Sequence, residues 1–390
     1  MSASDLAGSV LPLAENKIRV AGARDVTWSS EPTERQIWLL GLFVCLLFLA
    51  VVLPMASPLA LVDGTGDNGA YVRIASAIHH WRFDGITPKL FWGLPYAMAA
   101  LAALTGVSEQ TALLLISVAS SFITLLLVYR LWGAWTAGFF AILNFDWISR
   151  SVLGGAEPLF VALLFASFLL MRKERWAAAS AMAALATVVR PLGIFALIGM
   201  GLTLMWKKEY WRLLWSTLTG ALIGGLYILP MALLYRSPMA NFQAYQQRDW
   251  TGGMLVDIPF RAIVRNVMAS HEPWTNLGLT TLWMLVVVTG TILWLRKATA
   301  PQMLRAHPAE TFFFLAYVLF LFTYNSGWAR ADFPRFAIPI LPFVLVALNE
   351  WLPKDARVLW PGAAATATLA ACSTLGIRNV AEVIRKGLGG

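Results

Sequence analysis

The sequence predicts an all-α polytopic membrane protein with about eleven transmembrane helices, in a range of about ten to thirteen. The chain has 390 residues, of which 58% are hydrophobic and only 13% are charged, and its mean hydropathy is +0.66. A soluble globular domain has far more charged residues than this. Apolar stretches of roughly 15 to 24 residues recur between short charged or Pro/Gly-rich connections, and lipid cannot satisfy an open backbone, so we expect helices.

The predicted spans follow the apolar segments along the chain. They are residues 37–55, 108–131, 134–148, 158–171, 176–189, 192–206, 213–235, 279–295, 311–324, 336–350 and 358–373. The segment "LFWGLPYAMAALAALT" at 90–105 is short and contains Pro95. We expect it to be a juxtamembrane or re-entrant helix without a net crossing, because a crossing there would place later basic connections on the wrong side.

Lysine and arginine set the predicted orientation. The connections at 171–175, 207–212, 295–307 and 353–357 are basic, and positive residues mark cytoplasmic connections. The predicted organisation has three parts: a cytoplasmic tail at 1–36, a transmembrane domain at 37–373 whose first external loop and juxtamembrane helices occupy 56–107, and a C-terminal tail at 374–390.

Composition and motif searches exclude several function classes. The net charge of +9 does not indicate a nucleic-acid partner, because the basic residues gather at helix ends and form no patch with stacking aromatics. Cys45 and Cys372 lie in apolar segments, so no disulfide framework is predicted. The sequence contains no HExxH or GxSxG motif.

The first external loop, "DGTGDNGAYVRIASAIHHWRFDG" at 63–85, is unusually polar for this chain. Asp67 is followed at helical spacing by Tyr71, Ile74 and Ala75, which predicts a short interfacial helix with Asp67 near its N-terminus. Two interpretations of Asp67 stay open at this point. It is either an N-cap, or a general base for an attacking hydroxyl.

Glu157 and two arginines are further candidates on the same predicted side. Glu157 starts a span before Pro158, and it either complements the helix dipole or belongs to a polar pocket. Arg190 lies between two apolar runs, so it either binds a lipid phosphate or extends to the interface. Arg335 begins a span that continues with Pro339 and Pro342, so we expect an irregular helix start beside the charge.

The remaining pocket candidates are Tyr71, Arg73 and His79. The pair His79–His80 gives only a weak metal signal, because neighbouring helix positions point about 100° apart, and we predict no metal site. The 236–278 segment, with the motif "RDWTGG", is a candidate lid.

Several motifs together resemble the GT-C integral-membrane glycosyltransferases, and in particular the second mannosyltransferase of GPI-anchor assembly and its bacterial relatives. They are "DNGAYVRIA", "PKLFWGLPYAMAALAALTG", "GGAEPLFVALLFASFLL", "VVRPLGI" and "FPRFAIPILPF", which occur in the family's order over about residues 38 to 350. Two departures are Ala156 where the eukaryotic pattern has Ser, and the missing Trp before Asp67, which leaves Asp63 as a rival base.

The resemblance implies a function and a set of roles. It implies inverting transfer of a mannose-like or other sugar from a polyprenyl-phosphate carrier to a hydroxyl of a glycan, lipid or protein acceptor. Asp67 or Asp63 would be the catalytic base, and Arg190 and Arg335 would bind the donor phosphate. The expected location is the bacterial inner membrane, with the active site facing the periplasm. The alternative function is a transporter or flippase for a lipid-linked or anionic substrate, for which charges near the midplane of the membrane are expected.

Overall fold

A computed structural model describes residues 31–64, 66–269, 274–296 and 299–376. Within these ranges the chain is helical, and its only β-type pairings are two isolated bridges, Trp250 with Ser326 and Val256 with Tyr324. The prediction of an all-α protein rich in apolar helices is therefore confirmed.

The helices follow one another with short connections. The first half contains α1 (Glu34–Val52), α2 (Pro58–Gly64), α3 (Asn68–His80), α4 (Gly93–Thr105), α5 (Glu109–Trp132), α6 (Ala134–Leu143), α7 (Phe145–Leu153), α8 (Ala156–Arg172) and α9 (Trp176–Val189). The second half contains the turn η1 (Pro191–Gly193), α10 (Ile194–Trp206), α11 (Tyr210–Tyr235), α12 (Ala240–Arg248), η2 (Thr251–Gly253), α13 (Arg261–Met268), α14 (Trp274–Arg296), α15 (Thr299–Ala306), α16 (Pro308–Thr323), α17 (Phe333–Ala337), η3 (Ile338–Ile340), α18 (Leu341–Ala347) and α19 (Ala356–Leu375).

Every predicted span coincides with a helix, but two spans are broken. The predicted segment 134–148 ends as α6 at Leu143, and α7 starts anew because the Asn144 side chain accepts a hydrogen bond from the Trp147 amide. The predicted segment 336–350 is divided into α17, η3 and α18. Pro339 and Pro342 lack the amide hydrogens that a continuous helix needs there, as expected from the sequence.

Length and hydropathy separate the helices into two groups. Among the described residues, α1, α5, α11 and α19 are each long and apolar enough to cross a membrane alone. The pair α7 and α8, bent by 104°, passes the same test together. Other apolar helices, among them α4, are shorter, and the apolar part of α14 is the shorter stretch Thr280–Arg296. The total of about eleven crossings and the non-crossing assignment of α4 stay predictions.

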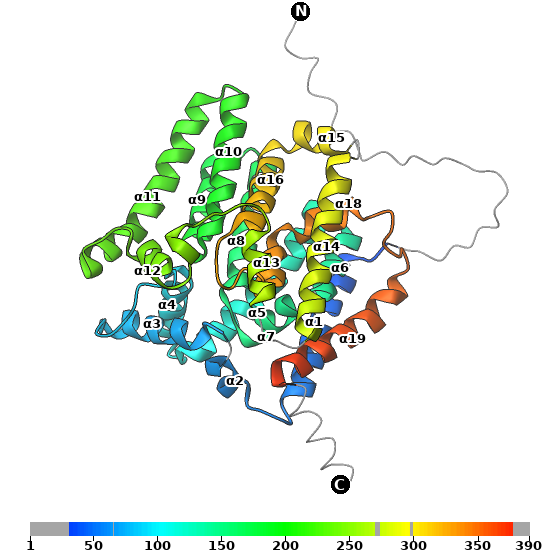
Figure 1. The fold of residues 1–390 in the computed structure, drawn as a ribbon, viewed down its shortest axis with the longest axis horizontal. Helices are drawn as coiled ribbons and strands as arrows, with labels where there is room; N and C mark the ends of the chain where they lie inside the picture. The colour runs from blue at the N-terminus through cyan, green and yellow to red at the C-terminus, as the bar shows by residue number, and fades with distance from the viewer. Residues whose placement is uncertain (1–30, 65, 270–273, 297–298, 377–390) are drawn as a thin grey trace, which may run out of the picture.

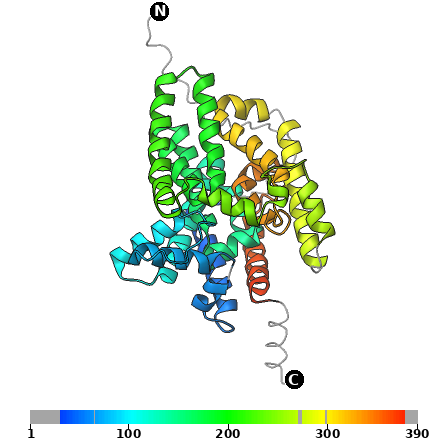
Figure 2. The ribbon, with the colours of Figure 1, turned by 60° about the vertical axis from the view of Figure 1, so that its left-hand side comes forward.

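The helices of the predicted first external loop gather at one end of the bundle. Figures 1 and 2 both show α2, α3 and α4 at the lower end, whereas α15 and the turn between α10 and α11 lie at the upper end. Helix α4 packs against α3, α5 and α9. Tyr71, Arg73 and His79, which the sequence singled out, thereby lie on a packed helix and not on a free loop.

A buried ion pair joins α8 to α16 beside α15. Arg172 donates from Nε to Glu310 Oε1 at 2.6 Å and from Nη2 to Glu310 Oε2 at 2.7 Å, and its Nη1 donates to the Leu131 carbonyl at 2.6 Å. The Glu310 side chain is only 2% exposed. A bidentate pair of this kind fixes the spacing of the two helices.

We expect Glu310→Ala to lower the free energy of unfolding by about 3–5 kcal/mol, because it leaves the Arg172 guanidinium poorly compensated among buried groups. The measurement is thermal unfolding of the purified protein in detergent. The matched control is Glu209→Ala, which removes the exposed partner of Arg212, 2.9 Å away, and should cost below about 1 kcal/mol. Equal effects of the two variants would contradict the structural role of Glu310.

Candidate functional site

The centre of the candidate site is the carboxylate of Glu157, in the first turn of α8. Arg190 donates from Nη2 to its Oε1 at 2.5 Å, and Arg335 donates from Nε to the same oxygen. The Glu157 side chain is 2% exposed. An acid that serves only the helix dipole needs no such partners, so Glu157 is the buried counter-ion of two guanidiniums.

Asp67 completes a cluster with these three residues. It occupies the N-cap position of α3, but its side chain makes no capping hydrogen bond. Its Oδ2 accepts instead from Nη2 of Arg335 at 3.4 Å, and the Asp67 side chain is 41% exposed. We call Asp67, Glu157, Arg190 and Arg335 the four-residue cluster. Of the two interpretations of Asp67, capping by the side chain is wrong; the base role stays a prediction.

The two arginines that contact Glu157 lie at the end of α9 and in the short helix α17. Helix α9 stops at Arg190, whose backbone is extended before Pro191 (φ −145°, ψ 131°), as expected for a residue that precedes proline. Arg335 lies in the five-residue helix α17, whose Pro334 carbonyl accepts from the Asn144 side chain at 2.9 Å. The Arg190 guanidinium also lies 5.6 Å from the centre of the Phe336 ring, a cation–π contact.

The start of α3 is fastened to the break between α7 and α8. The buried Asn68 side chain donates to the carbonyls of Leu153 and Gly154, both at 3.1 Å. Gly154 has φ +95°, which favours glycine at this bend. Two motifs that are far apart in the sequence, "DNGAY" and "GGAEP", thus lie in contact, and the position of Asp67 depends on both.

Arg150 on α7 is an unusual member of the site. The residue is only 9% exposed, and within the described part of the chain it forms no ion pair, while its buried Nη1 has no hydrogen-bond partner. Its guanidinium is covered by Gly66 (φ +54°), where an added Cβ would lie 2.7 Å from Nη2. A buried guanidinium with an unpartnered donor is suited to an anionic ligand.

Polar residues of other segments surround the cluster. Asp332 lies 3.7 Å from Nη1 of Arg335. Lys89, in the connection between α3 and α4, pairs with Asp249 at 3.0 Å and lies 5.9 Å from the centre of the Tyr245 ring. The predicted lid segment therefore contacts the predicted first external loop through Asp249 and Tyr245.

Tyr71 lies one helical turn after Asp67 and is buried. Burial raises the pKa of Tyr71 to about 12, to which Asp67 adds, while Arg190 and Arg335 act in the opposite direction. Burial also raises the pKa of Tyr245 on α12. Both phenols are therefore neutral near pH 7 and can serve as hydrogen-bond donors.

The other predicted pocket residues do not join the cluster. Arg73 is exposed. His79 lies 12 residues along from Asp67, about 18 Å away on the α3 axis, and it pairs with Glu109. The Asp63 side chain lies outside the described part of the chain, as do His271 and Glu272.

Sequence reasoning missed Lys89, Asp146 and the unpaired state of Arg150. Asp146 interacts electrostatically with Arg150 and Arg335, although it was placed inside the predicted span 134–148. A signal was available, because an ionisable residue within an apolar span indicates a functional site by default.

Comparison with known proteins gives a likeness to solved structures only. No family model and no curated protein matches the sequence. The chain resembles the crystal structure of ArnT from Cupriavidus metallidurans bound to undecaprenyl phosphate, with a TM-score of 0.48 and 15% identity over 80% of this chain. The apo structure of the same protein gives 0.46 at 15% identity, also over 80% of this chain. In both comparisons the chain spans 61% of the length of the ArnT structure.

We expect Glu157→Gln to lower the free energy of unfolding by about 3–5 kcal/mol, because the amide keeps the shape but leaves Arg190 and Arg335 without their shared counter-charge. Thermal unfolding in detergent measures this. Asp332→Asn is the matched control, since it removes a weaker, 31% exposed partner of the same Arg335 and should cost below about 1 kcal/mol. Wild-type stability of the Glu157 variant would mean that the arginines do not depend on it.

Proposed function

We propose that the protein is an integral membrane glycosyltransferase that moves a sugar from a polyprenyl-phosphate carrier to an acceptor hydroxyl, with inversion at the anomeric carbon. The observation that carries this proposal is the four-residue cluster, in which Arg335 contacts both Asp67 and Glu157 while Arg190 contacts Glu157. The cluster joins residues of motifs that resemble the GT-C glycosyltransferases. A mannose-like donor and a site on the periplasmic side of a bacterial inner membrane belong to the same proposal.

Asp67 is the proposed general base. Arg335 holds its Oδ2, and within the described residues no hydrogen bond reaches its Oδ1. The acceptor hydroxyl transfers its proton to Asp67 while its oxygen attacks the anomeric carbon. The bond from that carbon to the carrier phosphate breaks, and the electron pair leaves with the phosphate. This assignment needs no covalent intermediate on the protein.

Arginine side chains are the proposed partners of the leaving phosphate. Guanidinium donors match phosphate oxygens, and fixed donors stabilise the charge that grows as the bond breaks. Arg190 and Arg335 are oriented by Glu157, and Arg150 offers an unpartnered buried donor. We therefore add Arg150 to the two arginines that the sequence proposed.

The segment with α12 and η2 is the proposed cover of the donor. It is tied to the first loop by the Lys89–Asp249 pair and to the connection after α16 by the bridges at Trp250 and Val256. Opening would break these contacts together with the hydrogen bonds from the Asn241 side chain to the Pro88 and Leu90 carbonyls, and would admit a lipid-linked donor; closing would exclude water from the anomeric carbon.

Transport of an anionic lipid is the second candidate function, and the buried pairing of Glu157 with two arginines favours it. Charged residues enclosed by membrane helices also mark substrate paths in transporters. The exposed carboxylate of Asp67 separates the two functions, because a flippase needs no proton acceptor beside its phosphate site.

We expect Asp67→Asn to lower kcat for sugar transfer by about 10²- to 10⁴-fold with little change in donor binding, because a proton acceptor is lost and the phosphate partners are kept. The measurement is transfer of radiolabelled sugar from a panel of polyprenyl-phosphate sugars. Asp332→Asn is the matched control and should retain most of the activity. Loss only in Asp63→Asn would move the base to Asp63. Full activity in both the Asp67 and Asp63 variants would refute the acid–base proposal, and movement of lipid without transfer would favour the transporter.

We expect Arg150→Lys to weaken donor binding about tenfold or more, because an ammonium cannot replace the planar donor set of guanidinium. Binding of polyprenyl phosphate to the purified protein, followed by intrinsic tryptophan fluorescence, measures it. The matched control is Arg73→Lys, an exposed arginine on α3 outside the cluster, which should bind like the wild type. Unchanged affinity in Arg150→Lys would remove this residue from the phosphate site.

A further inference from the structure

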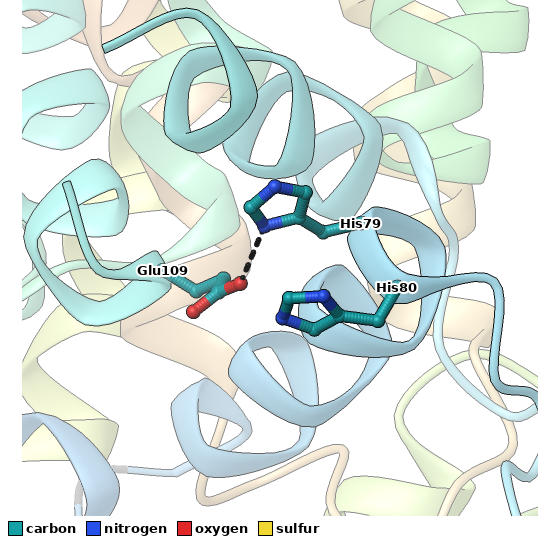
Figure 3. A group of neighbouring side chains, drawn as sticks. All are labelled: His79, His80 and Glu109. Atoms are coloured by element: carbon teal, nitrogen blue, oxygen red, sulfur yellow. Dashed lines mark hydrogen bonds and ion pairs between the residues drawn. The ribbon is translucent and has the colours of Figure 1, made fainter. Parts of the chain in front are cut away.

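Three potential metal ligands meet away from the four-residue cluster. His79 and His80 end α3, and Glu109 begins α5. One ligand atom from each lies within 4.8 Å of the other two, and the His79 Nδ1 lies 3.0 Å from the Glu109 Oε1. Figure 3 shows both imidazole rings extending toward the Glu109 carboxylate.

The two imidazole rings are stacked. This differs from the sequence-based expectation that neighbouring helix positions point apart. Their ring centres are 4.5 Å apart and the ring planes differ by 18°. The pair stands at the very end of α3, where Trp81 enters the left-handed region (φ 54°).

The donor set has a definite metal preference. Two imidazole nitrogens and one carboxylate oxygen are ligands for Zn²⁺ and related late transition ions, whereas Mg²⁺ and Ca²⁺ prefer oxygen alone. A zinc ion needs ligands at about 2.0–2.2 Å, which small rotations of three side chains already within 4.8 Å can provide. The His79 side chain is 29% exposed and that of Glu109 is 15% exposed, so an ion can reach the group from solvent and keep water as a fourth ligand.

We propose that His79, His80 and Glu109 form a three-ligand site for a zinc-class divalent ion that fastens the end of α3 to the start of α5. The site is separate from the sugar-transfer chemistry, and its existence does not depend on the proposed function. It has one mechanical consequence: α3 begins beside Asp67, so the bound ion fixes the far end of the helix that carries the cluster's exposed carboxylate.

The experiment uses the full chain in detergent micelles, without any affinity tag and after treatment with chelator. Zn²⁺ is titrated calorimetrically, and Co²⁺ is added as a spectroscopic probe whose visible absorption reports nitrogen and oxygen ligands. We expect one Zn²⁺ per chain, a melting temperature that rises with Zn²⁺ but not with Mg²⁺, and at least a tenfold weaker affinity in His79→Ala and His80→Ala.

Glu109→Gln keeps the size of the side chain and a hydrogen bond to a neutral His79, so it tests the site even where the histidine variants fold poorly. It should also bind Zn²⁺ at least tenfold more weakly. His307→Ala, which changes the histidine just before α16, should bind like the wild type. Wild-type affinity in Glu109→Gln and both histidine variants, or the absence of a stoichiometric site in the wild type, would overturn the proposal.

Discussion

The structure of the site depends on one buried carboxylate with two guanidinium partners. Glu157 accepts both from Arg190, at the end of α9, and from Arg335, in α17. Removing charges from water is costly, and only close, hydrogen-bonded opposite charges offset that cost. Glu157 is therefore the reason that two arginines can lie together inside a mainly apolar bundle. Asp67 then attaches the first loop to the same network through Arg335.

Broken helices supply the positions that this network needs. The chain interrupts its helices at Asn144, at Gly154, before Pro191 and around Pro339. An interruption leaves backbone groups without helical partners, and inside a membrane protein these groups must be satisfied by other parts of the protein. Here side chains at one break donate hydrogen bonds to backbone carbonyls at another. Asn144 donates to the Pro334 carbonyl, and Asn68 donates to the carbonyls of Leu153 and Gly154. These hydrogen bonds link the helix breaks to one another, and the charged side chains of the four-residue cluster lie near the breaks.

The sequence predicted the helices well because apolar segments of this length have no alternative in lipid. It also proposed Asp67, Glu157, Arg190 and Arg335, since an ionisable residue beside an apolar run must be paired or functional. What it could not give is the pairing itself. Arg335 lies 268 residues from Asp67 and 178 from Glu157, and no local pattern encodes such contacts. The unpartnered Nη1 of Arg150 and the approach of His79 and His80 to Glu109 have the same cause, because both depend on how separate helices pack.

Under the proposed function, the opposing charges also suit turnover. Three bare guanidiniums would bind a phosphate tightly in every state, including the polyprenyl phosphate that remains after transfer, and product release would become slow. Two of them share the single negative charge of Glu157, and each of these still has N–H donors beyond the one given to Glu157. A phosphate therefore finds donors already oriented, so little reorganisation is needed when its charge grows. The same carboxylate that makes the arginines tolerable in the fold thus limits how strongly they retain the spent carrier.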